Sequence, residues 1–101
     1  MQTTLSVPSY ADLVGLVGQP VQVLDDVGLE LTVECLSTPV TFAGLTSYSV
    51  RLTGPSGRHL APGRHPLRSS TAHFELVLEH IGSDLRYQHY EAFRQEYSER
   101  R

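Results

Sequence analysis

Few residues in this chain could carry chemistry, and a metal site is the first use to consider for them. The chain has five histidines and one cysteine. His73 and Glu75 stand two residues apart in a stretch that alternates like a β-strand, so both side chains can point toward one ion. No second group of histidine or cysteine has a recognised ligand spacing. We therefore expect no specific metal site and no cofactor.

Catalytic patterns are equally weak. No serine stands in a G-x-S-x-G sequence, and the Gly-Pro-Ser-Gly stretch at 54–57 lacks the lysine and helix of a P-loop. Asp25 and Asp26 are adjacent carboxylates in a turn, where aspartate is a common turn former. Cys35 falls in the apolar phase of a strand, which predicts a small core residue rather than a reactive thiol. We predict that the protein is not an enzyme.

The charges are segregated along the chain, whose net charge is −3. Residues 1–34 contain acids and no arginine, whereas residues 35–74 contain arginines and no acid. If the two stretches lie side by side, the charges pair on the surface and each pair contributes little, which is the interpretation we favour. If they face apart, they would steer a protein partner or a second copy into place. The candidate interaction residues are Arg51, Arg58, Arg64, Arg68, Asp25, Asp26, Glu30 and Glu34.

Other partner classes are disfavoured by the composition. Four arginines in an acidic chain form a poor phosphate track, so we expect no nucleic-acid partner. No apolar run approaches the roughly 18 residues needed to span a bilayer. Residues 1–7 lack the basic and apolar parts of a signal peptide. A single cysteine excludes an internal disulfide and fits a reducing compartment. We expect a cytoplasmic protein with no membrane partner.

The elements that must position these residues begin with one short helix. Ser9 is a good N-cap and Asp12 follows at the third helical position, where a carboxylate favours the positive helix end. Gly15 weakens the helix and Gly18 is placed to end it. The preceding residues, 1–8, are predicted to form an arm or an edge strand.

The rest of the chain has the pattern of an antiparallel β domain. Alternating apolar and polar residues predict strands separated by turn residues every 8 to 12 positions. We predict one mainly β domain over residues 1–101, a small antiparallel barrel or sandwich behind one short N-terminal helix. The clear strands are expected at 21–24, 29–37, 47–52 and 72–81, with weaker ones at 40–42 and 65–67.

In the C-terminal segment, residues 85–97, the spacing of the apolar residues fits both the alternation of a strand and the period of a helix. We favour a strand to about Phe93, followed by a frayed or helical tail over residues 94–101. Four aromatic residues of this segment could form a partner-binding stripe, because tyrosine is favoured at interfaces, although the core is the preferred place for most of them. These residues are Tyr87, Tyr90, Phe93 and Tyr97, of which Tyr87 and Tyr90 are candidate interaction residues.

Several short stretches follow one another in an order that can be compared with known domains: Ala-Asp-Leu-Val-Gly-Leu-Val-Gly-Gln-Pro-Val at 11–21, Leu-Ala-Pro-Gly at 60–63, Phe-Glu-Leu-Val-Leu at 74–78, and Gly82 with Tyr-Glu-Ala-Phe at 90–93. Together they resemble the DUF6916 family of small bacterial domains of unknown function. Val21 and His80 depart from the family pattern. The resemblance implies a compact β-rich fold without known catalytic residues. Association of the family with phage-tail-collar-like proteins implies a structural role in a multi-subunit bacterial assembly.

Two functions from different classes follow. The first is a non-catalytic assembly, adaptor or structural accessory module, possessing a protein partner or forming a homo-oligomer. It would work by complementary charge and by adding residues 1–7 as a strand to a neighbour's sheet. The alternative is a small-ligand or carbohydrate-binding β-barrel that uses residues at a strand-end mouth, namely Tyr48, His59, Arg64 or Tyr87.

Overall fold

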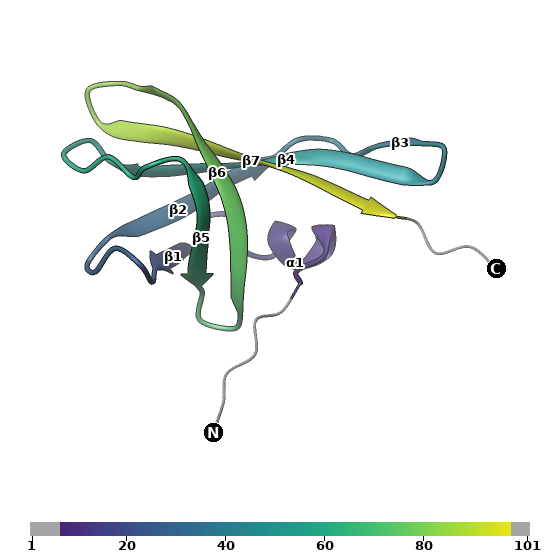
Figure 1. Ribbon diagram of the computed structural model, residues 1–101, viewed down its shortest axis with the longest axis horizontal. Helices are drawn as coiled ribbons and strands as arrows, with labels where there is room; N and C mark the ends of the chain where they lie inside the picture. The colour runs from purple at the N-terminus through teal and green to yellow at the C-terminus, as the bar shows by residue number, and fades with distance from the viewer. Residues whose placement is uncertain (1–6, 98–101) are drawn as a thin grey trace.

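The computed structural model describes residues 7–97, in which a short helix precedes seven strands (Figure 1). Every strand pairing in it is antiparallel. The elements are α1 (Tyr10–Val14), β1 (Pro20–Val23), β2 (Glu30–Leu36), β3 (Val40–Phe42), β4 (Leu45–Pro55), β5 (Gly63–Arg68), β6 (His73–Ser83) and β7 (Tyr87–Tyr97).

Six of the strands close into a barrel. Their order is β2-β1-β5-β6-β7-β4, and β4 pairs back onto β2. β3 is the extra strand, hydrogen-bonded to the beginning of β4 outside the barrel. Closure removes unpaired edges within the barrel wall. The prediction of a mainly β, antiparallel barrel with one short helix is confirmed.

The helix begins as its residues predict. The Ser9 hydroxyl accepts from the Asp12 N–H at 3.1 Å, and the Asp12 carboxylate accepts from the Ser9 N–H at 2.9 Å, which is a capping box. The predicted end at Gly18 is wrong for the helix proper, which ends at Val14 with Gly15 as its C-cap. Gly18 has φ of +84° and its N–H donates to the Val33 carbonyl at 2.7 Å, so it turns the chain into β1.

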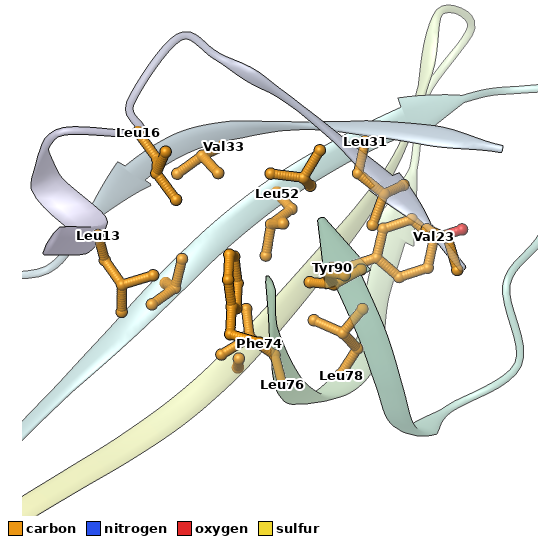
Figure 2. Packing of buried hydrophobic residues seen from close by; sticks show 14 of the residues in the cluster. Leu13, Leu16, Val23, Leu31, Val33, Leu52, Phe74, Leu76, Leu78 and Tyr90 are labelled. Atoms are coloured by element: carbon orange, nitrogen blue, oxygen red, sulfur yellow. The ribbon is translucent and has the colours of Figure 1, made fainter. Parts of the chain in front are cut away.

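The barrel interior is filled by side chains. Figure 2 shows Leu13 and Leu16, from α1 and the turn after it, on one side of the cluster and Tyr90 with Val23 on the other. Phe74 and Tyr90 are the largest fully buried side chains. The prediction of Tyr90 as an interaction residue is wrong, because its ring is 1% exposed. Its hydroxyl accepts from the Leu60 N–H at 3.0 Å and so fixes the loop before β5.

A β-bulge changes the phase of β2. Val33 pairs with Leu52, whereas Cys35 pairs with Arg51, so two steps on β2 match one step on β4. The alternation that buries Leu31 and Val33 therefore stops, and Cys35 is exposed. The prediction that Cys35 is a core residue is wrong for this reason.

The C-terminal segment is a single long strand. β7 continues to Tyr97, paired with β4 along its whole length, so the predicted tail is wrong for residues 94–97. The remaining tail, residues 98–101, lies outside the described part of the chain, as do residues 1–6 of the predicted arm. Val7 and Pro8, the described end of that arm, belong to no strand.

Asp84 shapes the turn between β6 and β7. Its carboxylate accepts from His89 Nε2 at 2.9 Å and from the N–H groups of Arg86 and Tyr87 at 2.8 Å each. The hydrogen bond from His89, followed by the two backbone bonds, lowers the pKa of Asp84 to about 2. β6 runs to Ser83, so the turn that the sequence predicts at residues 82–84 begins only after Ser83.

Gly54 lets β4 approach the core, and we expect Gly54→Ala to destabilise the protein. A Cβ at this position would lie 2.7 Å from Leu31 Cδ2 and 3.4 Å from Tyr90 Cε2. Both side chains are fully buried and have little room to move. Overpacking of this kind costs about 1–3 kcal/mol, which urea unfolding would measure. Gly57→Ala is the control, because nothing lies within 4 Å of its added methyl; equal losses for both variants would contradict the prediction.

Candidate functional site

The most distinctive surface is a three-stranded sheet that extends beyond the barrel. We call it the wing: β3, residues 45–49 of β4 and residues 93–97 of β7. It projects to the right of the barrel in Figure 1. β3 and β4 are joined by the two-residue turn Ala43-Gly44, with φ of +54° and +80°. Positive φ at both positions is the geometry of a tight hairpin turn whose twist suits the two strands.

The outer face of the wing is apolar. Strand registers place Phe42 beside Leu45 and Leu45 beside Tyr97, and they place Phe93 beside Ser49. Side chains directly opposite each other in an antiparallel pair lie on the same face. Phe42 is 82% exposed, Phe93 62% and Tyr97 84%, and Val40 is exposed on the same face. Exposed apolar patches rimmed by polar residues are candidate interaction sites.

This face carries no charged side chain among the described residues of the wing. Ser47, Ser49 and Gln95 fill the positions between the apolar ones. The first charges lie toward the barrel, where Arg51 and Glu91 are 3.3 Å apart. Charge depletion with aromatic enrichment is the composition found at the centre of protein interfaces.

The inner face of the wing is polar and is held to the N-terminal part of the chain. The Tyr48 hydroxyl donates to Glu96 at 2.7 Å, and the Tyr10 ring packs edge-on against Tyr48 with centroids 4.9 Å apart. Arg94 donates to the Pro8 carbonyl at 2.8 Å. Burial of Tyr48, followed by its hydrogen bond to the Glu96 carboxylate, raises the pKa of Tyr48 to about 12. These contacts fix the angle at which the wing leaves the barrel.

The favoured interpretation of the segregated charges is confirmed for two of the five acids of residues 1–34, Asp25 and Asp26, which pair with the basic middle stretch. Asp26 forms an ion pair with Arg58, and Asp25 lies 3.1 Å from His65 Nδ1. His65 Nε2 lies 2.6 Å from the Ala61 carbonyl oxygen, so this buried ring joins the β1–β2 turn to the loop before β5. The acidic hairpin and the basic middle of the chain are thus neighbours in the fold.

The other arginines of the middle stretch find different partners. Arg64 is 3.4 Å from Glu75, and Arg68 donates to Gln22 at 2.9 Å. Within residues 7–97, Glu30 and Glu34 form no ion pair. Among the eight charged residues predicted as an interaction surface, only Asp26 and Arg58 form an ion pair with each other within residues 7–97.

Two of the predicted aromatic residues behave differently. Tyr87 is on the outer face of β7, together with Phe93 and Tyr97, because odd-numbered residues of this strand point outward. Tyr90 lies in the core on the opposite face. Three of the four aromatic residues are therefore exposed, so the preferred placement of most of them in the core is wrong. The part that the sequence did not indicate is β3, whose Val40 and Phe42 complete the apolar face.

The residues proposed for a ligand-binding mouth are not brought together. Tyr48 contacts Tyr10 and Glu96, whereas His59 packs edge-on against His80 with centroids 4.4 Å apart. Arg64 pairs with Glu75 on the outside of the barrel. Three surface depressions of about 250–350 Å³ are lined by other residues.

The described residues also bear on the metal hypothesis. No group of three or more histidine, cysteine, aspartate or glutamate residues within 7–97 is arranged to hold a metal ion. Glu75, considered from the sequence with His73, is instead the partner of Arg64. No helix in this part of the chain is both long and apolar enough to span a membrane.

Fold and site together define a small closed antiparallel β-barrel that carries an apolar sheet extension. No protein-family model, curated protein or solved structure matches this chain. The resemblance to the DUF6916 family therefore stays a prediction.

Tyr48 gives a pH-dependent test of the wing's inner face. Its pKa in the folded protein, about 12, is above the ordinary value of 10.0, so folding disfavours its ionisation. The stabilisation is complete below pH 10 and is lost as the pH rises toward 12. We expect Tyr48→Phe to cost about 1 kcal/mol at neutral pH and to show a smaller fall in unfolding free energy over this alkaline range. Tyr97→Phe, at an exposed position, is the control, and an alkaline fall shared equally by both variants would refute the assignment.

Proposed function

We propose that the protein is a non-catalytic assembly module that self-associates by packing the outer face of its wing against the same face of a second copy. The observation that carries the proposal is that this face is uncharged and exposes four large apolar side chains, those of Val40, Phe42, Phe93 and Tyr97. The resemblance described above supports a structural role of this kind within a larger bacterial assembly.

The charge of the wing supports a second copy as the occupant. Two molecules of net charge −3 repel each other overall, and contact is easiest where the surface is locally neutral. The outer face of the wing is uncharged from Phe42, which lies beside Leu45, to Phe93, which lies beside Ser49. A self-complementary patch of one surface is also what a twofold-symmetric dimer requires.

The area is sufficient for a weak specific contact. Phe42, Phe93 and Tyr97 at their observed exposures contribute about 450 Å² per copy, taking roughly 200 Å² for a whole aromatic side chain. Two copies reach about 900 Å² from these rings alone, and Val40 and Leu45 bring the total close to the roughly 1,000 Å² of a specific interface. A reversible association is therefore expected, rather than an obligate oligomer.

The test removes the apolar face without touching the barrel. We expect Val40→Thr with Phe42→Thr to weaken self-association by about tenfold or more, because threonine keeps the strand propensity and removes the apolar area. Mass against concentration, by light scattering or sedimentation, measures the effect.

The matched control is Val27→Thr with Leu85→Thr, which alters side chains that are 90% and 98% exposed outside the wing. This variant should associate like the unaltered protein. If the unaltered protein stays monomeric at millimolar concentration, or if both double variants associate equally, the proposed function is wrong.

A further inference from the structure

We infer that the free edge of β7 pairs with the β7 edge of a second copy, antiparallel and centred on Gln95, which joins two wings into one continuous sheet. The inference deepens the proposed self-assembly, because it names a second contact and its register. It concerns the edge of the wing rather than its outer face.

The edge is open in the described part of the chain. β7 pairs with β4 along all of its residues, but with β6 only along residues 88–91. Residues 92–97 therefore have no strand on the side away from β4 among residues 7–97. An unpaired run of six residues is a ready template for adding a strand.

The backbone of this edge is directed outward at alternate residues. The Tyr87 carbonyl accepts from the Asp84 N–H, on the side of β7 away from β4. Backbone groups alternate sides along a strand, so Phe93, Gln95 and Tyr97 direct their N–H and C=O groups to the free edge. On the other side of the ladder, the Ser49 carbonyl accepts from the Ser37 N–H and so points away from β7, which is consistent with this alternation.

Three antiparallel registers, centred on residues 94, 95 and 96, pair the outward N–H and C=O groups of this edge with those of a second copy. The charged side chains select one of the three. A register centred on residue 94 would place Arg94 opposite its own copy, and one centred on residue 96 would do the same for Glu96. Like charges directly opposite each other destabilise a strand pair. Centring on Gln95 places Arg94 opposite Glu96 of the second copy, twice by symmetry.

The same register is favourable on both faces. It places Phe93 opposite Tyr97 of the second copy on the outer face, and aromatic pairs across strands are stabilising. The facing residues exchange about six backbone hydrogen bonds. The outcome is a sheet in the order β3-β4-β7-β7-β4-β3, whose outer face doubles the apolar surface of one wing.

Charge reversal tests the register. In Arg94→Glu each copy presents two acids to the partner, and in Glu96→Arg each presents two arginines. We expect either variant alone to raise the dissociation constant by about tenfold or more, because both cross-strand pairs become repulsive. An equimolar mixture of the two variants should associate again, since acids then face arginines in both pairs.

Restoration on mixing separates the register from simple damage to the fold. A variant that loses association because it is misfolded stays monomeric in the mixture. Urea unfolding of each variant checks that the barrel is intact, because Glu96 and Arg94 also contact Tyr48 and Pro8.

A cross-link gives an independent measurement. In a Cys35→Ser background, Gln95→Cys should form an intermolecular disulfide on mild oxidation, because facing residues of a hydrogen-bonded pair have Cα atoms about 5.5 Å apart, within the disulfide range. Ser47→Cys in the same background is the control: Ser47 is the neighbour of Gln95 on β4, one strand from the edge. We expect little cross-linking of Ser47→Cys.

The outcomes separate this inference from the proposed function. Equal association of the two charge variants and the unaltered protein, or equal cross-linking at positions 95 and 47, overturns the edge pairing and leaves the outer-face contact standing. Loss in each charge variant with recovery on mixing supports the edge pairing, even where the threonine variants of β3 associate normally and the outer-face contact fails. A protein that stays monomeric throughout overturns both.

Discussion

The fold depends on one long strand pair, β4 with β7. The two strands pair over eleven consecutive positions, from Leu45 with Tyr97 to Pro55 with Tyr87. One half of this ladder lies in the barrel wall, where Val50, Leu52, Tyr90 and Ala92 enter the core. The other half continues past the last residues that the neighbouring strands β2 and β6 can reach. The barrel and the wing are therefore parts of one ladder.

Much of the fold could be predicted because its strands obey a local rule. The alternation of Leu31 and Val33 with polar neighbours, or of Phe74, Leu76 and Leu78 with theirs, is set by a sheet with one buried face. The N-cap at Ser9, with Asp12 at the third helical position, is also a local signal, and this prediction is confirmed. These signals need no knowledge of which strand lies beside which.

The errors arise where the outcome depends on distant parts of the chain. Cys35 continues the apolar phase of its strand, and only the pairing of β2 with β4 introduces the bulge that turns it outward. Tyr90 and Phe93 look alike in sequence, yet one faces the core and the other faces outward because β4 fixes the phase of β7. The sequence does not indicate the apolar face of the wing for the same reason. The residues around Phe42 do not reveal whether another element packs over its side chain.

The bulge in β2 has a practical consequence for solution work on this protein. It brings the sole thiol of the chain, that of Cys35, to the outside of the barrel, next to Arg51 on the adjacent strand. A maleimide dye or a nitroxide label will thus attach at one known position on the rigid β2–β4 ladder without any engineered cysteine. Because β4 also runs into the wing, a label on Cys35 keeps a defined position relative to the wing. Distances between labels on neighbouring molecules can therefore be related to the position of the wing.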